Sequence, residues 1–174
     1  MLVDKIGPGS KAPDIVNVLI EIPAMGQPVK YEIDKETGAV FVDRFLATPM
    51  FYPCNYGFVP GTLAGDGDPI DVLVWCPYTL SPGVVIPTRI IGVLDMEDEA
   101  GEDYKLIGVP SPKISPAFNH INDVQDLPET LLAQIKHFFE HYKDLEPNKW
   151  VKVRSLKNKE EALTLLKAAI EAAS

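Results

Sequence analysis

Short runs of apolar and β-branched residues, separated by turn residues, fill the first two thirds of the 174-residue chain. Prolines and glycines fall between these runs, where turns need fixed or positive φ angles. We expect strands within four ranges: Val16–Ile22, Val40–Leu46, Asp71–Cys76 and Val84–Leu94. Short strands at this spacing predict a small β barrel.

The pattern changes to a helical period after the proline-rich segment VPSPKISP. Apolar residues predict one helix over Leu131–Tyr142, with Asp126 and Glu129 as its capping box. A second amphipathic helix is expected from about Lys159 to Ala173, begun by Asn158. We therefore predict a mainly β protein of the α+β class, in which two helices from the carboxy-terminal half flank the barrel. The length favours a single domain over residues 1–174.

The formal net charge of −9 narrows the function classes. Nucleic-acid surfaces need clustered Lys and Arg, so a general nucleic-acid-binding role is disfavoured. No apolar run reaches the roughly 20 residues that span a bilayer, and the charged amino terminus does not resemble a secretory peptide. We expect a cytoplasmic protein. A phosphate substrate is still compatible with this charge, because bound metal ions reverse the local sign of an acidic site.

Nine of the 25 acidic residues lie in two bursts, Asp66–Asp71 and Asp95–Asp103, with none between them. Each burst adjoins an apolar run, so each is expected at a strand end. Gly67 permits a tight bend and Asp68 precedes a proline, so carboxylates in the first burst can converge. Like charges converge at high cost unless a cation lies between them, and no His or Cys nearby suggests a soft metal.

A single acidic burst is more often a solvated surface loop without a binding role. A calcium-binding EF-hand does not fit either, because its twelfth position would be Pro77 or Leu106 instead of glutamate. Paired bursts favour a site for hard cations such as Mg²⁺.

A site that binds a polyanion also needs cations and hydroxyl donors. Lys30 and Glu32 share one face of a strand by the period of two, and Arg44 interrupts an apolar strand. Further candidates are Tyr52, Tyr56, Lys105, Tyr142 and Lys143, although their spacing does not prove that they meet. The chain has neither GxxxxGK[ST] nor GxGxxG, so nucleotide binding by those loops is disfavoured.

Taken together, the motifs DGDPIDV, EIPA, KYEIDK, VDRF, FYPCNYG, DEAGEDYK and HFFEHYKD closely resemble those of the soluble family I inorganic pyrophosphatases, from about Ile15 to Val153. The resemblance implies a five-stranded OB-type barrel with flanking helices. It also implies Mg²⁺-dependent hydrolysis of inorganic diphosphate to two orthophosphates, by a metal-bridged water or hydroxide and without a covalent intermediate. Several Mg²⁺ ions would bind per site, and other divalent ions could substitute. The compact chain resembles the bacterial branch, which implies a homohexamer.

The resemblance also implies residue roles. Asp66, Asp71 and Asp103 would bind the first Mg²⁺, Asp71 would also approach the second, and Asp98 with Asp103 would hold a substrate-associated metal. Asp68 would orient the attacking water and take its proton, while Glu21 and Glu32 would act on metal-bound waters. The implied substrate-binding residues are Lys30, Arg44, Tyr56, Lys105, Tyr142 and Lys143. The implied catalytic set is Asp68, Tyr56, Arg44 and Lys30.

Two other functions need consideration. His137, Glu140 and His141 match HxxEH, the inverted zinc-peptidase motif. Both histidines flank the apolar face of the predicted helix, where surface or subunit contacts are the commoner outcome. The second alternative is an OB-type module for single-stranded nucleic acid, which normally presents a basic groove with exposed aromatic residues. The acidic bursts disfavour it.

Overall fold

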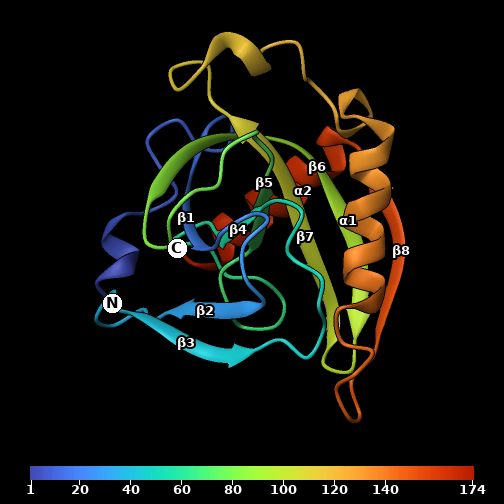
Figure 1. Ribbon diagram of the computed structural model, residues 1–174. Coiled ribbons are helices and arrows are strands. Elements are labelled where there is room, and N and C mark those ends of the chain that lie inside the picture. The colour runs from blue at the N-terminus through green and yellow to red at the C-terminus, as the bar shows by residue number, and fades with distance from the viewer.

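A computed structural model of the protein describes residues 1–174. The eight strands are β1 (Val16–Ile22), β2 (Val29–Ile33), β3 (Val40–Phe45), β4 (Asn55–Phe58), β5 (Asp71–Val74), β6 (Val85–Asp98), β7 (Gly101–Pro110) and β8 (Val151–Lys157). Five of them form a closed ring in the order β1-β4-β5-β7-β6, because β6 pairs with β1 as well as with β7. The sixth strand of this sheet, β8, extends it along β6 (Figure 1). The expected five-stranded barrel of the OB type is confirmed.

Strand β6 serves two parts of the sheet because it is long. Its first residues, Val85–Thr88, pair with β1 and close the barrel. Its last residues, Val93–Asp98, pair with β8 on one side and with β7 on the other. The second acidic burst therefore lies on a β hairpin that extends beyond the barrel, and not simply at a strand end.

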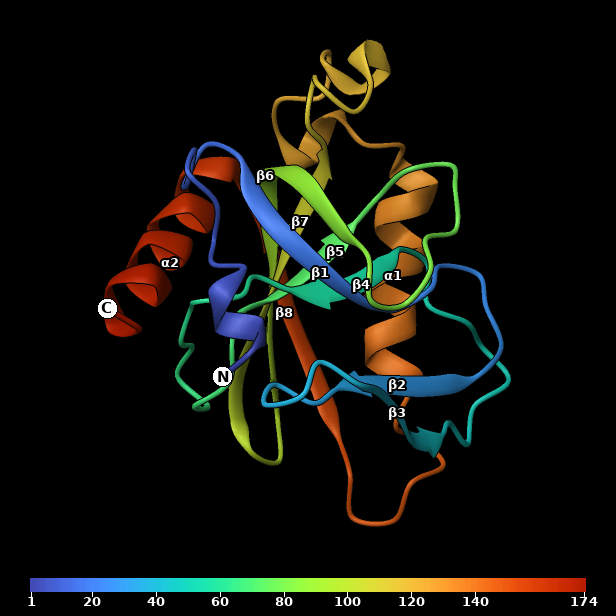
Figure 2. The same ribbon diagram turned by 90° about the vertical axis from the view of Figure 1, so that its left-hand side faces the viewer.

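Two helices, α1 (Glu129–His141) and α2 (Lys159–Ala172), lie on opposite sides of the barrel strands (Figure 2). Successive residues of the strands alternate between two cores, as the strand period requires. Val72 belongs to the core that includes α2, and Leu73 belongs to the core that includes α1. The predicted start of α2 is confirmed, because the Asn158 side chain accepts a hydrogen bond from the backbone at Glu161.

The proposed capping box of α1 is wrong. The residue before α1 is Pro128, which has no side-chain acceptor. The Asp126 carboxylate instead accepts hydrogen bonds from the backbone of Asn122 and Asp123, and it caps a short 3-10 helix. The three 3-10 helices span Val3–Lys5, Pro116–Phe118 and Val124–Asp126. Pro128 separates the 3-10 helix that ends at Asp126 from α1. The spacing of Asp126 and Glu129 alone did not reveal this boundary.

The hairpin of β2 and β3 is separate from the barrel sheet and stands beside it. Most of the β3 side chains are exposed. An irregularity at Asp43 shifts the register, so that Lys30 lies directly opposite Arg44. No helix of the chain has the length and hydropathy needed to cross a membrane.

Candidate functional site

One cavity of about 230 Å³ is lined by every residue to which the family resemblance gave a metal-binding, substrate-binding or catalytic role. Only two of its 15 lining residues are hydrophobic, whereas the larger cavities of the chain are lined mainly by apolar atoms. The nominated residues that line it are Glu21, Lys30, Glu32, Arg44, Tyr56, Asp66, Asp68, Asp71, Asp98, Asp103, Lys105, Tyr142 and Lys143. The structure thus places them together, and their individual roles stay predictions.

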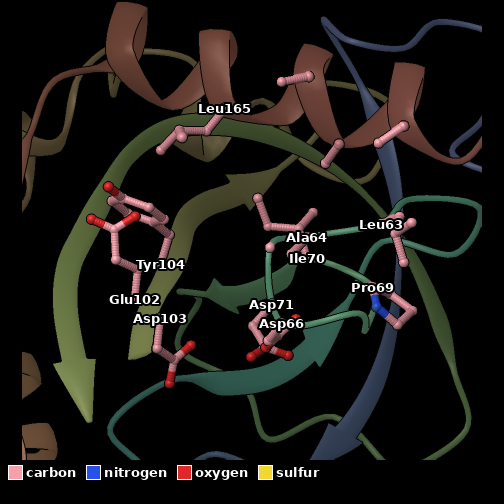
Figure 3. Close-up of a pocket in the computed structure, with 14 residues that line it drawn as sticks. Leu63, Ala64, Asp66, Pro69, Ile70, Asp71, Glu102, Asp103, Tyr104 and Leu165 are labelled. Atoms are coloured by element: carbon pink, nitrogen blue, oxygen red, sulfur yellow. The ribbon is translucent and has the colours of Figure 1, made fainter. Parts of the chain in front are cut away.

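The first acidic burst forms a tight loop that enters β5. Gly67 has a φ of +90°, which favours glycine, and the Ala64 amide donates to the Asp68 carbonyl at 2.7 Å. The Asp66 carboxylate accepts a hydrogen bond from the Asp68 amide at 3.0 Å. Figure 3 shows Asp66, Asp71 and Asp103 lining a neighbouring pocket that Leu165 of α2 also lines. The expected bend brings carboxylates from two segments together.

The second burst divides between the two faces of the β6–β7 hairpin. Of its six acidic residues, only Asp98 and Asp103 line the cavity. Asp98 pairs with the Lys143 ammonium at 2.8 Å. The neighbouring Glu99 contacts Lys143 at 3.5 Å and Lys149 at 2.9 Å, and so ties the hairpin tip to the segment after α1.

Lys105 lies at the centre of the acidic wall. Its buried ammonium contacts Asp71 at 2.7 Å, Asp103 at 2.9 Å and the Tyr56 hydroxyl at 2.9 Å. Burial by itself would lower the pKa of Lys105, but the facing carboxylates raise it well above its usual value. Burial also raises the pKa of Tyr56, so this phenol stays protonated and can donate a hydrogen bond. Tyr52 does not line the cavity; its ring packs on Tyr56, with centroids 5.2 Å apart.

The opposite wall brings two cations face to face. Lys30 and Arg44 are cross-strand partners, an arrangement that is unfavourable for like charges. Asp43 lies 3.4 Å from the Lys30 ammonium, and Glu146 lies 2.8 Å from Arg44 Nη1. The buried Nε of Arg44 nevertheless has no hydrogen-bond partner. An anionic ligand would offset the repulsion and supply the missing acceptor.

Glu21 shows how strongly the site disfavours an uncompensated charge. Its carboxylate accepts a hydrogen bond from the Ile33 amide at 2.9 Å. Burial, reinforced by the nearby Asp71 carboxylate, raises the pKa of Glu21 to about 7. No cationic side chain forms an ion pair with it. A bound cation would favour its charged form.

The carboxylates of the cavity suit a hard metal ion. All metal-binding candidates offer oxygen atoms, and neither His nor Cys lines the cavity. No three potential ligands stand in coordinating positions, and the Lys105 ammonium lies between Asp71 and Asp103. The oxygen donors fit divalent cations such as Mg²⁺. In the metal-free arrangement, the Lys105 ammonium partly neutralises the carboxylates of Asp71 and Asp103.

One residue that lines the cavity, Lys35, was not among the predicted site residues. Lys35 follows β2, and its ammonium lies 2.5 Å from Asp68 Oδ1. The period of two that paired Lys30 with Glu32 ends with β2 at Ile33, so strand periodicity gave no indication of Lys35. The only signal was its presence in the motif KYEIDK.

The HxxEH residues lie outside this cavity. The rings of His137 and His141 are in contact, with centroids 4.6 Å apart, and His141 pairs with Asp144 at 2.7 Å. His137 lines an apolar groove between α1 and the segment Pro49–Pro53. These contacts fit a surface or interface role better than a peptidase centre.

Comparison with known proteins agrees with the fold and the cavity. The family model described as inorganic pyrophosphatase matches residues 18–174. The chain belongs to this family. An inorganic pyrophosphatase from Escherichia coli O6:H1 is 61% identical over 165 residues, covering 95% of this chain and 94% of that protein.

Solved pyrophosphatase structures are similar over almost the whole chain. The protein from Coxiella burnetii has a TM-score of 0.92 and 53% identity, covering 97% of this chain and 99% of that chain. The protein from Thermus thermophilus has a TM-score of 0.94 and 44% identity, covering 99% of both chains. Membership of the family supports a metal-dependent hydrolase and gives no support to the peptidase and nucleic-acid alternatives.

Proposed function

We propose that the chain hydrolyses inorganic diphosphate to two orthophosphates with Mg²⁺ as its activating metal. The decisive observation is a single polar cavity that contains seven carboxylates and five cationic side chains. Carboxylates can hold divalent cations, while separate cations can hold phosphoryl oxygens. A site with only one kind of charge would not suit a metal–diphosphate complex.

The cations lie where they can bind both ends of a small polyanion. Lys30 and Arg44 form one wall, and Arg44 Nε has an unused donor. Lys105 and Lys143 belong to the opposite, acidic wall. The protonated phenols of Tyr56 and Tyr142, whose pKa values are raised chiefly by burial, can donate to phosphoryl oxygens. Fixed donors of this kind stabilise charge on the leaving phosphate.

We assign the metal-binding role to the acidic residues that face the cavity. These are Asp66, Asp71, Asp98 and Asp103, with Glu21 and Glu32 acting on the surrounding water. When bound, Mg²⁺ would lower the pKa of water and neutralise part of the phosphate charge. Asp68 has a largely exposed carboxylate at the edge of the cavity, and we assign to it the orientation of the attacking water and the acceptance of its proton.

Phosphate release from diphosphate tests the proposal. The purified chain should release two phosphates per diphosphate with Mg²⁺, and chelation of the metal should abolish the activity. A parallel titration with Zn²⁺ in place of Mg²⁺ should give less activity. Phosphate release that is unaffected by chelation would contradict the metal role, and no release at any Mg²⁺ concentration would contradict the function.

We also propose a cytoplasmic homohexamer, on the basis of the family resemblance. A groove of about 580 Å³ beside α1 includes His137, and Phe51 in its wall is exposed. Replacing both His137 and His141 with alanine should weaken assembly more than hydrolysis, because neither lines the catalytic cavity. Sedimentation and phosphate release should be measured on the same samples. A fully assembled double variant without activity would contradict this assignment, and cell fractionation tests the location.

A further inference from the structure

The carboxylate of Asp68 is mostly exposed, and one cation fixes it. Its side chain is 66% exposed, and its only side-chain partner is the Lys35 ammonium, 2.5 Å from Oδ1. We propose that Lys35 is a positioning residue that holds Asp68 in the orientation needed for proton transfer; this rests on the proposed diphosphate hydrolysis. The contact leaves Oδ2 without a partner, and therefore open to a water in the cavity.

The backbone that carries Lys35 is well fixed. Within the turn after β2, the Asp34 carboxylate accepts from the Thr37 amide at 2.8 Å and from the Thr37 hydroxyl at 2.6 Å. The Val3 amide donates to the Lys35 carbonyl at 3.2 Å, which attaches the turn to the first 3-10 helix. The Lys35 side chain is 27% exposed, much less than that of Asp68. A braced cation therefore holds a carboxylate that is otherwise free to rotate.

The loop around Asp68 needs such a contact. Gly67 at its tip has no atom near its Cβ position, and Asp66 to Asp68 are exposed. The loop's own hydrogen bonds fix its backbone, but none of them fixes the Asp68 carboxylate. Rotation of that carboxylate would move the proton acceptor by more than an ångström, and a misplacement of this size can lower a rate about 10²-fold.

The other four cations of the cavity have different carboxylate partners. Lys30 pairs with Asp43, Arg44 with Glu146, and Lys143 with Asp98, while Lys105 bridges two acids of the central wall. None of them contacts Asp68. If Lys35 acts through Asp68, replacing Lys35 should not change kcat in a variant whose residue 68 cannot accept a proton.

A double-mutant cycle tests this dependence. Lys35→Met should lower kcat about 10- to 100-fold, with KM for the magnesium–diphosphate complex changed less than about threefold. In an Asp68→Asn background, adding Lys35→Met should produce no further decrease. Lys35→Arg should recover most of the activity, because its guanidinium can still reach the carboxylate.

Lys157 of β8 offers a matched control, because it pairs with an acidic residue of β6 that does not line the cavity. Lys157 pairs with Asp95 at 3.0 Å and has an exposure of 33%, similar to that of Lys35. Lys157→Met removes a comparable ion pair outside the cavity, and kcat should stay unchanged. Circular dichroism of each variant confirms that it is folded, and Lys35→Gln provides a second neutral variant if Lys35→Met does not fold.

Nuclear magnetic resonance supplies a readout that does not depend on turnover. In the metal-free protein, Lys35→Met should increase the fast motion of the Asp68 side chain, measured by carbon-13 relaxation, while Lys157→Met should not. Equal decreases in kcat in both Asp68 backgrounds, or a rise in KM without a change in kcat, would overturn the proposal. Unchanged Asp68 motion would also overturn it. Absence of phosphate release by the wild-type chain would contradict the proposed function instead, and the relaxation data would still decide whether Lys35 positions Asp68.

Discussion

The two faces of the β6–β7 hairpin carry the same kind of residue and serve different purposes. On one face, Asp98 and Asp103 line the catalytic cavity. On the other, Asp95, Glu97 and Glu102 gather around Arg154 of β8, at distances of 2.8, 3.8 and 3.4 Å. Asp95 also pairs with Lys157. Alternation along the strands therefore separates one acidic burst into a reactive set and a structural set.

The difference between the faces lies in how completely their charge is compensated. Asp95 is buried but has two cations within 3.0 Å. The cavity holds seven carboxylates and five cations, and within it Glu21 has no cationic partner. Replacing an acid should consequently reduce activity on the cavity face and reduce stability on the other face.

The largest effect is expected for Asp103→Asn. Loss of a proposed metal-binding charge should lower kcat/KM at least about 10³-fold, because the metals supply several kcal/mol of transition-state stabilisation. The matched variant Asp95→Asn, on the opposite face, should keep its activity. Phosphate-release kinetics over a range of Mg²⁺ concentrations provides the measurement. Similar losses in both variants would remove the proposed distinction between the faces.

Asp68→Asn should have the next largest effect, and it separates proton transfer from metal binding. The asparagine keeps the size and one acceptor but loses the base, so kcat should fall about 10²- to 10⁴-fold. Mg²⁺ affinity should change much less than in Asp103→Asn, and the residual activity should rise toward high pH. An unchanged kcat and pH profile would assign Asp68 no catalytic role.

Asp95→Asn should destabilise the chain. It leaves Arg154 and Lys157 without their common buried partner, so the free energy of unfolding should fall, but by less than for a fully buried pair because both cations are about one-third exposed. Urea unfolding in the presence of chelator provides the measurement, with Asp103→Asn as the comparison. No loss of stability would indicate that the outer cluster is only a solvated surface network.

Glu21→Gln should have the opposite effect and a smaller one. The folded pKa of about 7 lies above the ordinary value of 4.5, so ionisation costs the metal-free protein stability as the pH rises from 4.5 to 7. The variant should be more stable than wild type by about 1–3 kcal/mol at pH 8, and equally stable below pH 4.5. Urea unfolding at both pH values with chelator tests this. A variant less stable at pH 8 would contradict the raised pKa.

Much of the fold could be predicted because its signals are local. The strand around Val16–Ile22 has the predicted bounds, and α2 begins at the predicted Asn158. Strands β4, β7 and β8 were not predicted as separate elements, and β2 was predicted only as the strand that carries Lys30 and Glu32, without bounds. They are short, polar or placed next to acidic residues, and partner strands distant in the sequence stabilise them.

Residue types and motifs in the sequence by themselves determined the candidate chemistry, namely oxygen donors for a hard cation together with cations for a polyanion. They also indicated which segments carry that chemistry, since the acidic bursts and the KYEIDK motif are evident in the sequence itself. Local hydrogen bonding and hydrophobic periodicity depend on near neighbours, so the chain itself encodes them directly.

Only the tertiary structure decided which charges meet. It placed Asp98 and Asp103 in the cavity, paired Asp95 with Arg154, and brought Lys35 to Asp68 across 33 positions of the sequence. Such contacts depend on strand register and on loop closure between distant segments. A shift of one residue in register would exchange the two faces of the hairpin, because the side-chain period of a strand is two.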